Sequence, residues 1–246
     1  MKRVARTAAA LVIGNELLSG KIQEANLIEL ARLMRALGIR LTRALFVPDE
    51  IDVIVEAVSD LKQRADVVFT SGGVGPTHDD VTVEAIARAF GVDAVVEPTL
   101  ASLLREVYGD RCTDAHLRMA LVPRGAELVS SPDVRWPTPL MGNVYVLPGV
   151  PEIFRMRLDA VRSQLSGPQP FVSQAVFLTL DEPELTARLN QVVQAHPDVE
   201  IGSYPKWFDP AYKTKVTFDA QDEQAVKRAV EAFVSLFTRE QIVRVE

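Results

Sequence analysis

Short apolar segments alternate with amphipathic helical segments through the first 165 residues, and this alternation is the feature that most constrains the fold. Residues 8–13 form a continuous apolar run, which is typical of a strand covered on both faces. Apolar residues at helical spacing follow at 27–37, and the further runs at 41–47, 66–70 and 144–147 each precede another helical stripe. Strands that alternate with helices predict a parallel sheet with right-handed crossovers, so we expect a doubly wound α/β domain.

The order of elements changes after residues 166–170, a Ser-Gly-Pro-Gln-Pro segment that is typical of a linker. Beyond it the apolar pattern predicts the order β-α-β-β-α-β, the split βαβ arrangement. The expected elements are strands at 171–180, 199–203, 212–220 and 242–245, with helices at 183–195 and 222–237. We therefore predict a larger domain at residues 1–167 and a smaller α+β domain at residues 168–246.

The charge and cysteine content argue against several classes of protein. The chain has 27 Lys and Arg residues against 33 Asp and Glu residues, a net charge of −6, which argues against a broad nucleic-acid-binding surface but does not exclude a local basic patch. Cys112 is the only cysteine, so an internal disulfide framework and a cysteine-rich zinc site are excluded. No apolar run approaches the roughly 20 residues that span a bilayer. We expect a cytoplasmic protein with no nucleic-acid or membrane partner.

The parallel sheet also predicts where a ligand would bind. In open α/β sheets, ligands bind beyond the carboxyl ends of the strands, at the point where the strand order reverses. If the order is the common 2-1-3, that crevice lies between the ends of the first and third strands. Residues 14–16, Gly-Asn-Glu, follow the first strand, and residues 71–80, Ser-Gly-Gly-Val-Gly-Pro-Thr-His-Asp-Asp, follow the third. We expect these two unusual loops to meet at the ligand site.

The loop at residues 71–80 has the composition of a phosphate site. Its glycines allow backbone N–H groups to surround an oxyanion, and the helix expected to begin near Val81 adds its partial positive charge. Asp79 and Asp80 would repel a bare phosphate, but they could hold a divalent cation shared with it. The alternative is structural: one aspartate caps the helix and the glycines form a tight turn.

Other polar residues near these loops have two interpretations each. Glu16 fits a metal ligand or a general base, and it equally fits an acidic residue that stabilises the first turn of a helix. Lys21 fits a phosphate contact or a solvated lysine, and Asn26 fits a helix cap or a ligand contact. Asp49 is expected to cap the helix that follows the second strand.

Two common phosphate-binding motifs are matched only in part by this sequence. The segment that begins at Gly14 resembles a P-loop, but one residue too many separates its glycines and Ile22 stands where Ser or Thr must reach magnesium. A dinucleotide fingerprint begins at Gly73, but His78 replaces its third glycine. Neither a kinase nor a dehydrogenase is therefore supported.

Three segments resemble, in the expected order, the signatures of the CinA amino-terminal family of competence/damage-inducible proteins. Residues 13–21 together with Asn26 are similar to the opening signature, residues 70–82 to the central one, and residues 147–152 to the third. This family is built on the MoaB/MogA type of molybdopterin-binding domain. The resemblance covers about the first 165 residues and implies a three-layer, doubly wound, mostly parallel sheet.

Further segments resemble the molybdopterin-binding-like half of eukaryotic-type FAD synthases, namely Trp136-Pro137, residues 143–147 and residues 201–205. Members of the wider family hydrolyse the pyrophosphate of ADP-ribose or FAD with a divalent metal, and relatives in the molybdenum-cofactor pathway bind molybdopterin. The resemblance therefore implies a small-molecule partner, a nucleotide or a pterin phosphate. It also implies association into a homo-oligomer, a dimer or a trimer.

The resemblance carries site roles onto the matching positions of this sequence. It implies catalytic roles for Glu16, Asp79 and Asp80, with Asp79 and Asp80 as metal ligands. The implied ligand and phosphate contacts are Gly14, Asn15, Ser71, Gly72, Gly73, Gly75, Pro76, Thr77, Pro148, Gly149 and Pro151. The implied cofactor is Mg, Mn, Co or Ni, helped by potassium. Two departures weaken single contacts, because Glu24 and Asn15 both stand where family members commonly have Asp.

Three hypotheses for the function follow. The leading one is a metal-dependent hydrolase of a nucleotide diphosphate compound such as ADP-ribose or FAD, because a phosphate-shaped loop ends in paired carboxylates. The second is a non-catalytic protein that binds molybdopterin or a nucleotide through the same loop. The third is a regulatory protein of competence or DNA damage.

Overall fold

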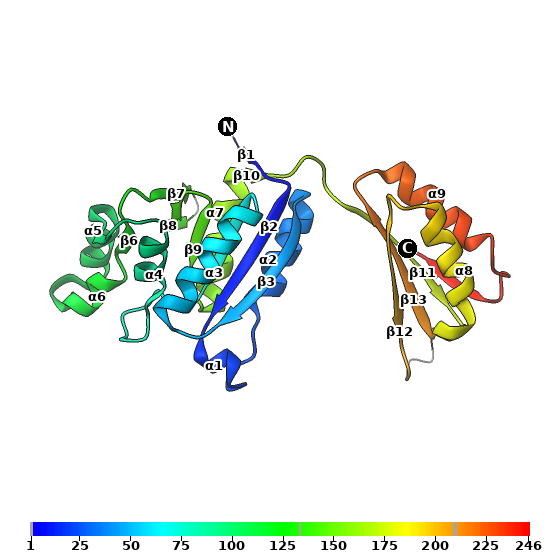
Figure 1. Cartoon of the computed structure of the whole chain (residues 1–246), viewed down its shortest axis with the longest axis horizontal. Coiled ribbons are helices and arrows are strands. Elements are labelled where there is room, and N and C mark those ends of the chain that lie inside the picture. The colour runs from blue at the N-terminus through cyan, green and yellow to red at the C-terminus, as the bar shows by residue number, and fades with distance from the viewer. Residues whose placement is uncertain (1, 133, 209–210) are drawn as a thin grey trace. The chain divides into compact units, whose positions relative to one another are not determined.

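A six-stranded sheet with the order β3-β2-β4-β9-β8-β7 organises the first part of the chain (Figure 1). Its four parallel strands are β2 (Thr7–Ile13), β3 (Arg40–Val47), β4 (Val67–Ser71) and β9 (Val144–Leu147). Its two antiparallel strands are β7 (Glu127–Ser131) and β8 (Val134–Met141). The predicted mostly parallel sheet is confirmed, and its first three strands have the predicted order 2-1-3.

The chain separates into two units, each with its own core. Unit 1 comprises Met1–Pro168 and unit 2 comprises Gln169–Glu246. The computed structural model describes residues 2–132, 134–208 and 211–246. Within these ranges, every helix is too short or too polar to span a bilayer.

Helices cover both faces of the unit 1 sheet, which confirms the three predicted layers. One face packs against α2 (Asn26–Leu37) and α7 (Pro151–Gln164), and the other against α3 (Ile51–Arg64) and α4 (Thr82–Ala89). β2 contributes to both cores because successive side chains of a strand point to opposite faces. Ala8 and Ala10 lie in the cluster with α2 and α7, whereas Ala9 and Leu11 lie in the cluster with α3 and α4.

Short elements complete unit 1 around the large sheet. They are β1 (Arg3–Val4), α1 (Asn15–Leu18), β5 (Ala94–Val96), α5 (Pro98–Tyr108), the 3-10 helix η1 (Gly109–Arg111), α6 (Asp114–Arg118), β6 (Leu121–Pro123) and β10 (Leu165–Ser166). β1 pairs with β10 in parallel, and β5 pairs with β6 in antiparallel fashion. Cys112 follows η1 as a free, half-buried thiol.

Strands β7 and β8 were not predicted from the sequence. Pro137 and Pro139 lie inside β8, and proline lacks the N–H group that a strand donates to its ladder, so the pattern argued against a strand. In β8, Pro139 lies opposite Leu128 of β7, and the pairing with β9 is limited to Leu140 and Met141.

Unit 2 has the predicted order β-α-β-β-α-β. Its elements are β11 (Val172–Leu178), α8 (Glu182–Ala195), β12 (Glu200–Pro205), β13 (Thr214–Ala220), α9 (Glu223–Val234) and β14 (Ile242–Val245). The strands form one antiparallel sheet with the order β12-β13-β11-β14. The predicted smaller α+β fold of the carboxyl-terminal part is confirmed.

Both helices of unit 2 pack on the same face of its sheet (Figure 1). The alternation along β13 shows which face this is, because Val216 and Phe218 are fully buried in the core with α8 and α9. The intervening residues Lys215 and Thr217 are partly exposed and point to the other face. Within the described residues of unit 2, no helix covers that second face.

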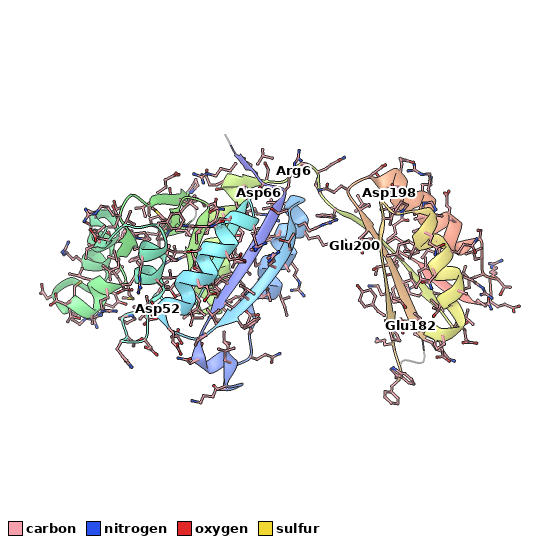
Figure 2. The ribbon with its side chains drawn as sticks, viewed as in Figure 1. Arg6, Asp52, Asp66, Glu182, Asp198 and Glu200 are labelled. Carbon is pink, nitrogen blue, oxygen red and sulfur yellow. The ribbon has the colours of Figure 1, made fainter. Side chains whose placement is uncertain are left out.

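Asp66 ties the start of β2 to the segment before β4 (Figure 2). One of its carboxylate oxygens accepts hydrogen bonds from the backbone N–H groups of Arg6 at 2.7 Å and Thr7 at 2.9 Å. In return, the Thr7 hydroxyl accepts the N–H of Asp66 at 3.0 Å. The N–H donors, that of Arg6 first, lower the pKa of the Asp66 carboxyl because they stabilise its charged form.

Replacing Asp66 with Ala should lower the free energy of unfolding at pH 7 by about 1 kcal/mol, because hydrogen bonds to an exposed carboxylate are lost. The folded-state pKa lies below the ordinary value of 3.8, so this stabilisation is present above that pH and is lost as the pH falls through the lowered pKa. Urea unfolding followed by Trp136 fluorescence, at pH 7 and in acid, measures both effects. The control Asp66→Asn keeps an acceptor without the charge. A loss in Asp66→Ala that is the same at both pH values would contradict the assignment.

Candidate functional site

Three strand ends of unit 1 meet at Gly72. This residue has φ +110°, and a Cβ on it would overlap the backbone carbonyl oxygen of Ile13 at the end of β2. The N–H of Gly72 donates to the carbonyl of Leu147 at the end of β9, at 3.2 Å. A Cβ on Gly149, in the loop after β9, would lie 3.3 Å from the Cα of Gly72. The loops after β2, β4 and β9 therefore lie side by side, and only glycine fits at their meeting point.

Thr82, at the start of α4, holds the glycine loop in place through two hydrogen bonds. Its hydroxyl donates to the carbonyl of Gly72 at 2.9 Å, and its N–H donates to the carbonyl of Gly73 at 3.0 Å. Gly73 has φ +64° and lies so close to this hydroxyl that a Cβ would overlap it. Because Thr82 is fully buried and its hydroxyl is satisfied, the loop has a defined path at this point.

Asp80 closes the exposed end of the same loop. Its Oδ2 accepts the backbone N–H of Thr77 at 2.8 Å and also the Thr77 hydroxyl. A Cβ on Gly75 would lie 2.6 Å from this oxygen, so the glycine makes room for the carboxylate. Asp80 thus acts as a turn residue and not as the helix cap, because Val81 occupies the N-cap position of α4 without a side-chain bond.

Three consecutive backbone N–H groups of the loop have no acceptor within the described residues. They belong to Gly73, Val74 and Gly75, whereas the N–H groups of Gly72 and Thr77 bond within the protein. Two of the three residues carry no Cβ that would cover the N–H group of a neighbour. Unpaired N–H groups in a loop before a helix form a concave site that favours an anion.

A cleft of about 600 Å³ brings the loops after β2, β3 and β4 together. It is lined by Asn15, Glu16, Leu18, Ser19, Lys21, Asp49 and Asp79. Of the predicted site residues, Asn15, Glu16 and Asp79 therefore share one cleft. Three of the lining side chains are acidic, and Lys21 is the cation among the described residues that line it. The cleft is consequently a site of excess negative charge, and its lining does not include Gly73, Val74 or Gly75.

Asp49 is a site residue that the sequence analysis missed. Instead of capping α3, its Oδ2 accepts the N–H of Asn15 at 2.8 Å, and Glu50 occupies the N-cap position. Burial raises the pKa of Asp49, and the charges of Glu16, Asp79 and Asp80 raise it further, although the N–H of Asn15 acts in the opposite direction. The signal available in the sequence was its position directly after β3, the strand that pairs with β2.

Glu16 and Asp79 face different surroundings within the cleft. The carboxylate of Glu16 turns back over its own loop, so a Cβ on Gly14 would lie 2.5 Å from Oε1. Asp79 is exposed, and the hydroxyl of Thr77, which it shares with Asp80, lowers its pKa together with its own N–H. Asp79 is therefore ionised at neutral pH and open to a ligand.

Asn26 joins the loops after β4 and β9 beneath the surface. Its Nδ2 donates to the hydroxyl of Ser71 at 2.9 Å and to the carbonyl of Gly149 at 2.8 Å, and only 5% of the residue is exposed. It is therefore neither the helix cap nor an exposed ligand contact. The cap of α2 is provided by Glu24, whose Oε1 accepts the N–H of Leu27 at 2.8 Å, so the longer acidic side chain at this position has a structural role.

The loop at residues 148–151 lies beside the glycine loop, because Gly149 closely approaches Gly72. Pro151 takes the first position of α7, as predicted, because proline has no N–H to leave unpaired there. Val150 occupies the N-cap position without a side-chain hydrogen bond. The amino-terminal end of α7 is consequently uncapped close to Gly149 and Gly72, and it adds partial positive charge at this edge.

The described residues contain no group of three His, Cys, Asp or Glu side chains placed to hold a metal ion by themselves. Any metal in this cleft would therefore need further oxygen ligands from water or a bound molecule. Such a mixed set is ordinary for magnesium, which is bound by one or two carboxylates together with substrate phosphates. The expected Mg, Mn, Co or Ni cofactor, the potassium and the homo-oligomer stay predictions.

Comparisons with known proteins agree with the two units. Residues 9–166 match the family described as "Probable molybdopterin binding domain", and residues 170–246 match the family "FAD synthase, middle domain". The chain resembles the crystal structure of the protein CinA from Thermoplasma acidophilum, described as of unknown function, with 30% identity and a TM-score of 0.59. That likeness covers 65% of this chain and 97% of the other. The resemblance to CinA and to molybdopterin-binding domains is confirmed.

Some relatives match over almost their whole length, and those described here include an archaeal protein. A protein of Archaeoglobus fulgidus is 34% identical over 224 residues, which cover 91% of this chain and 95% of that protein. A "Probable FAD synthase" of Caenorhabditis briggsae is 30% identical over 251 residues. These cover 90% of this chain but 48% of the worm protein, so the chain spans about half the length of that relative.

Replacing Gly72 with Ala should destabilise unit 1 by more than about 3 kcal/mol, because the new Cβ overlaps backbone that cannot move without separating β2 from β4. The matched control is Gly20→Ala. Gly20 has φ +71° and open space around it, so its substitution should cost only about 1 kcal/mol for the left-handed backbone. Urea unfolding of both variants tests the difference, and similar losses would show that the close approach is not the cause.

Replacing Asp49 with Asn should stabilise unit 1 at pH 7 by about 0.5–1 kcal/mol, because the amide can still accept from Asn15 while a crowded charge disappears. The raised pKa means that the folded state holds the proton more tightly than the unfolded state. Wild-type stability is therefore lost as the pH rises from 3.8 through the raised pKa, and the benefit of Asn vanishes below that range. Unfolding midpoints measured from acid to pH 7 check this sign, and a variant less stable than the wild type at pH 7 contradicts it.

Proposed function

Because this chain belongs to the family of molybdopterin binding domains, we propose that unit 1 binds a nucleotide or pterin through its phosphate groups. We further propose that it hydrolyses the pyrophosphate of a nucleotide diphosphate compound such as ADP-ribose or FAD. The match of residues 170–246 to the middle domain of FAD synthase supports a nucleotide in preference to a pterin. The observation that carries the proposal is that one loop, the loop after β4, has unpaired N–H groups and also contributes Asp79 to a cleft of carboxylates.

The backbone would bind the phosphates. The unpaired N–H groups of Gly73, Val74 and Gly75 would donate hydrogen bonds to phosphate oxygens without a positively charged side chain. The uncapped start of α7 would add partial positive charge. Lys21 lines the same cleft and would neutralise a second phosphate. Because these donors are held by packed glycines and by Thr82, they need little rearrangement when the ligand binds.

The carboxylates fit a divalent cation that is shared with the ligand. Asp79 is exposed and ionised, and the pKa of Asp49 is raised by burial first and then by the neighbouring charges of Glu16, Asp79 and Asp80. Asp79 and Asp49 would hold Mg, Mn, Co or Ni, with phosphate oxygens and water as the remaining ligands. The bound ion would supply neutralisation of the charge on the two phosphates.

Glu16 is the residue that we assign to proton transfer. Its carboxylate lies within the cleft, and a water molecule that attacks phosphorus would pass its proton to it. A new phosphorus–oxygen bond forms, and the bond between the phosphorus and the bridging oxygen breaks, so the leaving phosphate keeps that oxygen. With FAD, the products are AMP and FMN. Asp80 shapes the loop, since one of its oxygens already accepts a hydrogen bond from the backbone N–H of Thr77.

A second candidate function is binding without cleavage. It is favoured by the lack, among the described residues, of a three-member metal-binding group and by the structural use of Asp80. A protein that only held molybdopterin or a nucleotide would need the N–H groups of the loop and not the acidic cleft. The two functions therefore differ in what the carboxylates contribute.

The test measures turnover and binding separately. Purified protein with ADP-ribose or FAD and each of the four metals should release AMP, and Asp79→Asn should lower that rate by about 100-fold or more because the cation loses a charged ligand. The matched control Asp159→Asn removes the same charge from an exposed position of α7 and should leave the rate unchanged. Calorimetry of ADP-ribose and molybdopterin with chelator present measures binding alone.

Each outcome decides between the candidates. Turnover that depends on Asp79 supports the hydrolase. Tight binding without AMP release, unchanged in Asp79→Asn, supports the binding protein and contradicts the hydrolase. If none of these compounds binds, a phosphate ligand for this loop is wrong.

A further inference from the structure

One row of side chains on the open face of the unit 2 sheet alternates aromatic rings with cations. In the strand register, Tyr204 of β12 lies opposite Lys215 of β13, and Lys215 lies opposite Phe177 of β11. Phe177 in turn lies opposite Arg244 of β14, so the row crosses all four strands. The row belongs to the face away from α8 and α9, because the alternate positions of β13 fill the core.

Phe177 is a buried ring, and the two cations of this row lie over it. The guanidinium carbon of Arg244 lies 3.8 Å from the centre of its ring, and the ammonium of Lys215 lies 5.6 Å from it. Tyr212 packs edge-on against the same ring with the centroids 4.8 Å apart. Only 4% of Phe177 is exposed, so the two cations are held in place over a buried aromatic base.

Tyr204 provides a flat, exposed ring beside the cations. A Cβ on Gly202 would lie 2.9 Å from the Tyr204 hydroxyl oxygen and 3.0 Å from ring carbon Cε2, so the ring lies over the glycine along β12. With 57% of the residue exposed, the other side of the ring is open to solvent. The absence of a side chain at Gly202 is what allows this arrangement.

The turn after β12 adds two further rings at the same end of the sheet. Trp207 is 86% exposed and Phe208 is 98% exposed, so both project into solvent rather than line a pocket. The base of this hairpin is fixed, because the N–H of Lys206 donates to the carbonyl of Lys213 at 2.7 Å. Large aromatic side chains as exposed as these mark a surface that contacts another molecule.

The charge at this end is positive, in contrast to the net charge of −6 of the whole chain. Lys213 pairs with Asp181 at 2.9 Å, and Arg244 pairs with Glu246. Lys215 has no carboxylate partner within the described residues. Two further acidic residues of the open face lie at its opposite end, where Glu200, labelled in Figure 2, is opposite Asp219 in the register.

We propose that this aromatic and cationic end of unit 2 binds a short segment of single-stranded nucleic acid. Bases would stack on Tyr204 and Trp207, and the phosphates between them would lie beside Lys215 and Arg244. A strand suits the site better than a free nucleotide does, because the exposed rings project outward and enclose no pocket. The acidic opposite end limits the contact to a few nucleotides, and stacking on open rings gives little sequence preference.

The test uses the full-length protein and a fluorescein-labelled oligo(dT) of about 10 nucleotides, with anisotropy as the readout. Binding at low salt should weaken with a log–log slope of about −1.4, the value for two phosphate contacts on a single strand. Trp207→Ala and Tyr204→Ala should each weaken binding about tenfold, because one stacked base is lost. Lys215→Gln should also weaken binding and make it less sensitive to salt.

The matched control is Lys227→Gln, which removes one positive charge from α9 on the opposite side of the unit 2 sheet and should leave binding unchanged. Thermal melting shows whether each variant is folded. AMP, FMN and vesicles of phosphatidylserine with phosphatidylcholine are tested in parallel. The proposal is overturned if no oligonucleotide binds at low salt, or if Lys215→Gln and Lys227→Gln behave alike. It is equally overturned if AMP or FMN competes as well as the oligonucleotide, or if the vesicles alone bind. Because these variants lie outside unit 1, the outcome is independent of the proposed hydrolase.

Discussion

The contact between Gly72 and the carbonyl of Ile13 is the constraint on which the site of unit 1 depends. A side chain at residue 72 would push the loop after β4 away from the end of β2, and the loop after β9 approaches the same Cα through Gly149. Because no Cβ intervenes, three strand ends converge and their loops share one edge. The anion site that we propose is made of backbone N–H groups, so its geometry follows from the sheet and does not depend on the rotamers of long side chains.

The electrostatics of this edge combine two opposite demands. Unpaired N–H groups and the start of α7 favour an anion, whereas Glu16, Asp49 and Asp79 crowd negative charge into the neighbouring cleft. Burial raises the pKa of Asp49, and the charges of Glu16, Asp79 and Asp80 raise it further. An anion alone would increase this crowding, and a cation alone would leave the N–H groups unused. A phosphate together with a divalent cation satisfies both, which is why we prefer a metal-dependent reaction to simple anion binding.

The sequence predicted the parts of unit 1 that follow from periodicity and strand order. The apolar run before Gly14 and the helical stripe that ends at Gly38 are local patterns, and both elements formed where expected. β8 escaped prediction because its prolines contradict the usual strand pattern, although Pro139 lies opposite Leu128 in the ladder with β7. Asp49 escaped because its partner, the N–H of Asn15, is 34 residues away in the chain. The alternatives for Asp80 were a metal ligand and a helix cap, and neither named its turn with Thr77, since spacing alone does not show which oxygen is already bonded.

In unit 2, the composition of the whole chain did not predict the character of one local surface. A net charge describes the average of the whole surface, and the average of this chain is acidic. Strand register then collects residues that are far apart in sequence, such as Phe177, Tyr204 and Arg244, into one row on one face. Part of this pattern can be seen in the sequence, because aromatic residues and lysines are interspersed between residues 204 and 215. The row itself is a property of the sheet order, which explains why whole-chain charge argued against nucleic acid while the local surface favours it. In both units the chemistry is created by topology, in one case at the carboxyl ends of parallel strands and in the other across an antiparallel sheet.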